Sequence, residues 1–158
     1  MNDRTAPSSS SSAAASPARG VNPVALRLGY AGLIPFILGA ALVWLVREDA
    51  HPYVTDGLSR YAAVVISFLG AIHWGLGFRQ TVPSPTPFIW GVAPALLAWI
   101  ASTMPAYAGL VVEGFLLIVC YLVDRRLYPS LGASAWLTLR FRLSAVAALS
   151  CFIAAQGT

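Results

Sequence analysis

One histidine lies within an apolar stretch of the chain, where an ionisable side chain is costly. His73 stands in SFLGAIHWGLG, residues 67–77, and Gly70 and Gly77 fall on the same third of a helical circumference at about 100° per residue. Small residues on one helix face let a second helix approach closely, so we expect His73 to face protein rather than lipid. If His73 has a functional role, that role is as a ligand, as a proton carrier or as a polar anchor for a partner. The alternative, which we favour, is one hydrogen bond in a packed helix–helix contact.

The partner of the His73 face is expected to be the first apolar segment of the chain. That segment offers small residues at Gly32 and Gly39. Short connections favour contact between elements that are neighbours in sequence. We therefore expect the face that carries His73 to be buried against this segment.

Glu113 lies near the middle of another apolar stretch. An ionised carboxylate is costly in lipid, so this residue is expected to be either protonated or paired. His73 is a candidate partner, and the two side chains together would form a proton path of only two groups.

Two further charges stand at the ends of apolar stretches. Asp124 closes the stretch that contains Glu113, and Arg140 opens the last one. We expect an ion pair between Asp124 and Arg140 at the membrane surface, with a solvated charge cluster as the alternative.

Signatures of catalysis and metal binding are absent from the sequence. It contains no GxSxG, phosphate-binding loop, HExxH or CxxC motif. The acidic residues and histidine between the first two apolar stretches have no metal-ligand spacing: Glu48, Asp49, His51 and Asp56. We expect a solvated loop there, no metal, no cofactor and no enzymatic activity.

The composition is that of a membrane protein. Hydrophobic residues make up 58% of the 158 residues and charged residues 10%, whereas a soluble domain carries about 25% charged residues. The net charge of +4 comes from scattered arginines rather than a basic stripe, so a nucleic-acid partner is not indicated. The expected partner is the lipid bilayer.

Five apolar stretches are expected to cross that bilayer as helices. They span about 28–46, 61–78, 88–104, 106–123 and 137–155. Their residues do not alternate as barrel strands do, and helices are the other structure that satisfies its backbone in lipid. The sequence thus predicts an all-α membrane protein, a bundle of about five transmembrane helices over 23–158. Residues 1–22, rich in Ser, Ala and Pro, are expected to be disordered.

The arginines divide unevenly between the two sides of such a bundle. Eight fall on the side of the N-terminus: Arg4, Arg19, Arg27, Arg79, Arg125, Arg126, Arg140 and Arg142. The other side holds only Arg47 and Arg60. The excess of positive charge predicts a cytoplasmic N-terminus and a periplasmic C-terminus in a bacterial inner membrane.

Several segments together resemble one protein family. They are YAGLIPF at 30–36, SFLGAIHWG at 67–75, APALLAW at 93–99 and WLTLRFRLS at 136–144, together with the aspartate that closes the fourth stretch. The sequence resembles, over about residues 25–155, the small bacterial membrane proteins of unknown function that also include eukaryotic transmembrane protein 69. The resemblance implies that the positions matching family motifs are His73, Trp74, Asp124, Trp136 and Arg140. Glu113 is not part of that pattern.

The expected function follows from these observations. We expect a structural, assembly or accessory protein that binds a membrane-protein partner, or a second copy of itself, through small-residue helix faces. The alternative is a small transporter or channel subunit that uses His73 and Glu113.

Overall fold

The described part of the chain is entirely helical. The structure, a computed structural model, describes residues 21–82 and 84–157, so the expected disorder over 1–22 concerns residues that lie almost wholly outside it. The helices are α1 (Pro23–Ala31), α2 (Ile34–Leu45), α3 (His51–Gly77), α4 (Thr86–Ser102), α5 (Ala106–Leu127) and α6 (Leu137–Gln156), with short 3₁₀ turns η1 (Glu48–Ala50) and η2 (Ser134–Trp136). The all-α prediction is confirmed.

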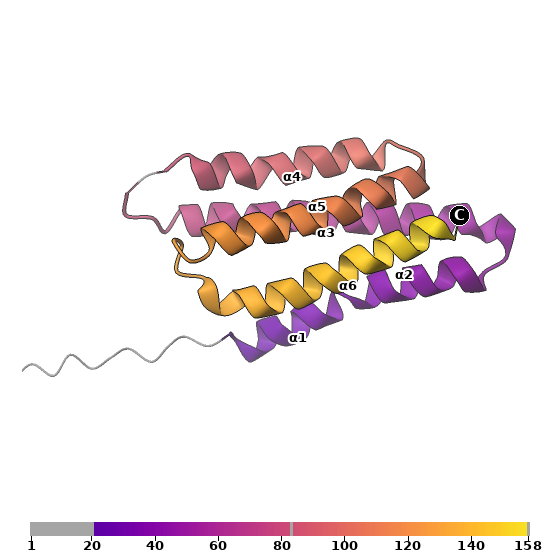
Figure 1. The fold of residues 1–158 in the computed structure, drawn as a ribbon, viewed down its shortest axis with the longest axis horizontal. Helices are drawn as coiled ribbons and strands as arrows, with labels where there is room; N and C mark the ends of the chain where they lie inside the picture. The colour runs from indigo at the N-terminus through magenta and orange to yellow at the C-terminus, as the bar shows by residue number, and fades with distance from the viewer. Residues whose placement is uncertain (1–20, 83, 158) are drawn as a thin grey trace, which may run out of the picture.

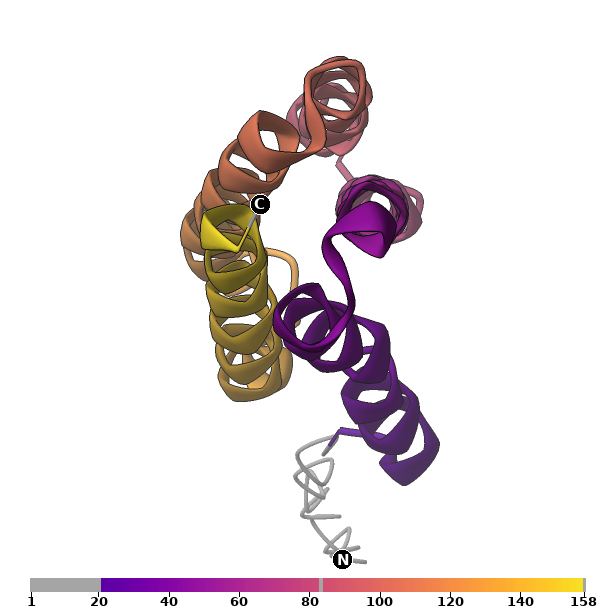
Figure 2. The same ribbon diagram turned by 90° about the vertical axis from the view of Figure 1, so that its right-hand side faces the viewer.

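The helices form a bundle of five stretches that run alternately in opposite directions, with α1 and α2 together making the first (Figure 1). Seen along the bundle, the order α2, α3, α4, α5, α6 closes into a ring (Figure 2), and α3 also contacts α5 across it. We call the end with the α3–α4 and α5–α6 connections the α5–α6 loop end, and the opposite end the α2–α3 loop end.

Length and composition make this a membrane bundle. Among the described residues, three helical stretches are long and apolar enough to cross a membrane: Pro23–Leu45, Ala106–Leu127 and Ser134–Gln156. Helix α4 is apolar but shorter. Helix α3 reaches well beyond the apolar run 61–78, because its first turns are polar and held by their own contacts, including an ion pair of 2.7 Å between Asp56 and Arg60.

The first membrane stretch is broken between α1 and α2. Pro35 lies in the first turn of α2 and has no N–H to bond to the turn before it. The carbonyl oxygen of Gly32 instead accepts a hydrogen bond of 2.9 Å from the hydroxyl of Tyr61. The phenol ring also packs edge-on against Phe36 at 5.2 Å between ring centres. The break is therefore tied to α3 by a side chain that donates to a backbone carbonyl group within it.

Helices α3 and α4 approach so closely that two glycines are required between them. A Cβ atom on Gly70 would overlap the carbonyl oxygen of Gly91, and one on Gly91 would overlap the indole of Trp74. The expectation that Gly32 and Gly39 of the first stretch cover this face is wrong. Close backbone approach is decided by facing small residues, and α4 supplies the facing one.

This contact gives a test with two glycines of the same helix. Replacing Gly70 with Ala should destabilise the bundle by about 1–3 kcal/mol, because the methyl group has no room. At Gly75 the same change meets open space, so it should be neutral or stabilise the helix by about 0.5–1 kcal/mol. Thermal unfolding in mild detergent measures both, and equal midpoints would contradict the close α3–α4 contact.

Candidate functional site

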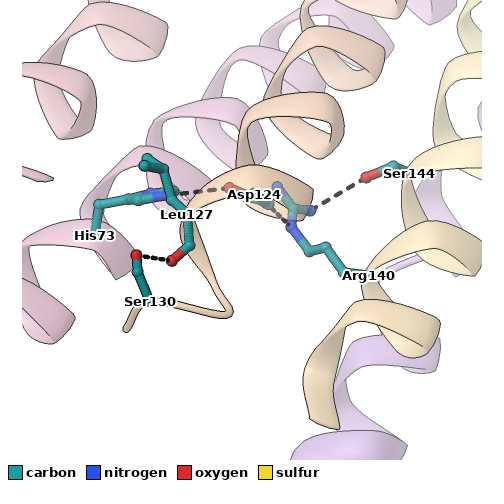
Figure 3. Close-up of polar contacts among 6 residues, drawn as sticks. All are labelled: His73, Asp124, Leu127, Ser130, Arg140 and Ser144. Carbon is teal, nitrogen blue, oxygen red and sulfur yellow. Dashed lines mark hydrogen bonds and ion pairs between the residues drawn. The ribbon is translucent and has the colours of Figure 1, made fainter. Parts of the chain in front are cut away.

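Three charged or ionisable side chains from three helices meet at the α5–α6 loop end of the bundle. His73 comes from the last third of α3, Asp124 from the last turn of α5 and Arg140 from the first turn of α6. Figure 3 shows the carboxylate of Asp124 lying between the imidazole and the guanidinium group. The connection between α5 and α6 folds Arg140 back onto Asp124, and the α3–α5 contact brings His73 to the same point.

The distances make Asp124 the centre of this site, which we call the Asp124 cluster: His73, Asp124, Arg140 and Ser144. Arg140 Nε donates to Asp124 Oδ2 at 2.5 Å, and Arg140 Nη1 donates to the hydroxyl of Ser144 at 3.3 Å. Asp124 Oδ1 lies 3.1 Å from His73 Nε2. The expected ion pair between Asp124 and Arg140 is therefore present, and it is buried rather than exposed at the surface.

Burial sets the energetics of the cluster. The side chains of His73 and Asp124 are 1% exposed and that of Arg140 is 8% exposed. A carboxylate removed from water is tolerated when a cation and hydrogen-bond donors compensate it. Arg140 supplies the charge and His73 lies against the other oxygen, so the cluster is close to neutral as a whole.

Some polar atoms of the cluster have no directed hydrogen bond among the described residues. The His73–Asp124 contact meets the distance but not the alignment of an N–H···O bond, and His73 Nδ1 and Arg140 Nη2 are also unsatisfied. The ring of Tyr128, itself buried, covers the imidazole at 5.8 Å between ring centres. The imidazole of His73 therefore lies close to the carboxylate of Asp124 without an aligned hydrogen bond between them.

Glu113 lies in the other half of the bundle and does not pair with His73. It is fully buried, and its Oε1 accepts a hydrogen bond of 3.1 Å from the hydroxyl of Ser59 on α3. The candidate pair of His73 and Glu113 is not formed, because His73 meets Asp124, eleven residues or about 16 Å further along α5.

The two tryptophans predicted as site residues lie outside the Asp124 cluster. Trp74 follows His73 but points toward α4, where its Nε1 donates to the carbonyl of Phe88 at 3.0 Å. Trp136 ends η2 just before α6 and lines a hollow of about 660 Å³ at the α5–α6 loop end, together with Arg79. Both belong to the edges of the bundle rather than to the site.

The sequence analysis did not identify three residues that contact the predicted site residues. Ser144 and Tyr128 each lie four residues from a predicted site residue, Arg140 and Asp124 respectively, so helical spacing could have found them. Ser59 is 54 residues from Glu113, and no local signal connects them. Within residues 21–82 and 84–157, no three His, Cys, Asp or Glu side chains gather as a metal site would require.

Comparisons with known proteins agree with a membrane protein. The profile of a family described as "Protein of unknown function (DUF3429)" matches residues 21–156. Transmembrane protein 69 of Xenopus tropicalis is 39% identical over 80 residues, which is 49% of this chain and 31% of that protein. The chain therefore spans about a third of the length of that relative. No solved structure matches.

The buried ion pair should behave as a unit when its members are replaced. Asp124→Asn and Arg140→Met should each destabilise the bundle by about 3–5 kcal/mol, because each leaves the other charge buried and uncompensated. The double variant should lose clearly less than the sum of the two.

The exposed Asp56–Arg60 pair on α3 provides the control. Asp56→Asn should cost less than about 1 kcal/mol. The measurement is the free energy of unfolding in mixed detergent micelles. Additive losses in the double variant would show that Asp124 and Arg140 do not depend on each other.

Proposed function

Because the chain belongs to the DUF3429 family of proteins of unknown function, we propose its function from the geometry: it is a non-enzymatic structural, assembly or accessory protein of a membrane. The observation that carries this proposal is the sealed and charge-balanced Asp124 cluster, which holds α3, α5 and α6 together. In some proteins a buried polar or ionic group specifies how helices associate even where it adds little net stability, and we assign that role to this cluster.

The setting of His73 favours this role over the alternative of a transporter or channel subunit that uses His73. A proton carrier must release and rebind a proton during its cycle. His73 lies against a carboxylate that is already paired with Arg140, and the side chains of His73 and Asp124 are both 1% exposed. Such an arrangement suits a fixed helix–helix contact better than repeated proton exchange.

The outward face of α3 is the surface we propose for a membrane-protein partner. Most glycines of the helices face other atoms of the bundle. A Cβ atom on Gly57 or Gly75 would instead meet nothing within 4 Å. Between them on the same face lie Val64 and Phe68, 66% and 65% exposed. Small residues beside exposed apolar ones suit the close approach of a second helix, either from a partner or from another copy of the chain.

The proposed location is a bacterial inner membrane with the N-terminus in the cytoplasm. The arginine excess at the α5–α6 loop end supports this orientation. The start of α1 and the end of α6 lie at opposite ends of the bundle (Figure 1), which supports an odd number of crossings.

A pull-down with a matched variant tests the accessory role. The tagged full chain, isolated in mild detergent, should retain a stoichiometric membrane-protein partner. Gly75→Leu should abolish that association, because the added side chain fills the space for the partner helix. Ala145→Leu, at an exposed position of α6, should retain it. A chain that purifies alone, or a partner indifferent to Gly75→Leu, would contradict the proposal.

Reporter fusions test the orientation. An enzyme active only in the periplasm should be active when fused after residue 158 and inactive when fused before residue 1, because eight of the ten arginines lie on the N-terminal side. Activity at both ends or at neither would mean that α6 does not cross the membrane.

A further inference from the structure

Glu113 is a buried carboxyl group that pairs with no cation in the described part of the chain. Its side chain has no exposed surface, and its one hydrogen-bond partner in the described residues is the neutral hydroxyl of Ser59. The second oxygen, Oε2, has no partner there, and no ion pair reaches the group. A carboxylate in such a place cannot be compensated as Asp124 is, so Glu113 is stable as the neutral acid.

A hollow opens close to Glu113 at the α2–α3 loop end. Its volume is about 620 Å³, and residues of η1, α3 and α5 line it, including His51, Thr55, Asp56 and Tyr107. Tyr107 precedes Glu113 by six residues on α5, about 9 Å along the helix axis. The buried acid therefore lies within two turns of a surface that water reaches.

Two hydroxyl groups lie along this interval on α3. Thr55 lines the hollow, donates to the carbonyl oxygen of His51 on its own helix at 2.9 Å, and precedes Ser59 by one helical turn, about 6 Å. Ser59 in turn donates to Glu113. On the facing helix, Gly109 has no side chain where a Cβ would lie 3.2 Å from Ser59 Oγ and 2.8 Å from the carbonyl oxygen of Ala101. The route from hollow to acid is thus lined by groups that both donate and accept hydrogen bonds.

The charged and titratable groups around Glu113 are few. From α6 the thiol of Cys151 lies within electrostatic range, and from α3 the hydroxyl of Ser59 donates to it. Glu48, His51 and Asp56 line the hollow. On the other side, Leu117 is 1% exposed and separates Glu113 from the Asp124 cluster.

We propose that Glu113 is a proton-binding site that exchanges its proton with water at the α2–α3 loop end through Thr55 and Ser59. In the exchange a proton passes from water in the hollow through the hydroxyls of Thr55 and Ser59 to Glu113 Oε1, or back along the same route, and the charge of the site changes between zero and minus one. This site is independent of the accessory role, because it lies outside the Asp124 cluster and away from the outward face of α3.

Infrared spectroscopy of the full chain in lipid vesicles tests the proposal. A protonated-carboxyl band should be present, should disappear in Glu113→Gln and should remain in Asp49→Asn, a change at an exposed acid outside the hollow. On transfer to heavy water the band should shift, which reports exchange of the proton. Absence of the band, or a band that never shifts, would overturn the proposal.

Hydroxyl variants test the route. Thr55→Val and Ser59→Ala should each slow the shift by about tenfold or more, equivalent to a barrier about 1.4 kcal/mol higher. The control is Ser67→Ala, since Ser67 on α3 also bonds a carbonyl of its own helix, at 2.8 Å, but lies away from the hollow. Ser67→Ala should leave the rate unchanged. A rate unaffected by both Thr55→Val and Ser59→Ala would refute exchange through these hydroxyls, provided circular dichroism shows all variants folded.

Discussion

The arrangement of α3, α5 and α6 depends on one buried carboxylate. Asp124 is 1% exposed, and no bulk water compensates its charge, so the cation and the imidazole must come from neighbouring helices. Apolar contacts in a bilayer discriminate weakly between alternative helix neighbours, because lipid is as apolar as the side chains it replaces. A buried charge that is tolerated in only one arrangement of helices discriminates strongly between alternative helix neighbours. Asp124 therefore fixes which helix faces meet at the α5–α6 loop end.

The two buried acids of α5 show how partners, rather than burial, set the character of a carboxyl group. Asp124 and Glu113 lie on the same face of one helix and both have essentially no exposed surface. Arg140 and His73 lie against the first, whereas a serine hydroxyl lies against the second. The first is suited to hold helices together through its ion pair. The other is suited to remain neutral and to exchange a proton.

The sequence predicted those parts of the site that depend on local spacing. Apolar runs predicted the helices, and the Asp124–Arg140 pair followed because a short connection joins the ends of two antiparallel helices. The partner of His73 depended instead on which nonadjacent helices touch. The close contact between Gly70 and Gly91 places α4 beside α3. Helix α5 then meets α3 across the ring, where Asp124 reaches His73. The order of residues along the chain does not indicate that Gly70 and Gly91 face each other.

The position of Arg140 in the last helix has a consequence for how the chain is made. Helices enter a membrane in the order of synthesis, and the residues of the cluster lie at 73, 124 and 140. Until α6 has inserted, Asp124 has no cation, and a nascent chain that stops before α6 carries an unneutralised carboxylate into the bilayer. Completion of the last span neutralises this charge, so the Asp124 cluster forms only in a chain that already contains α6.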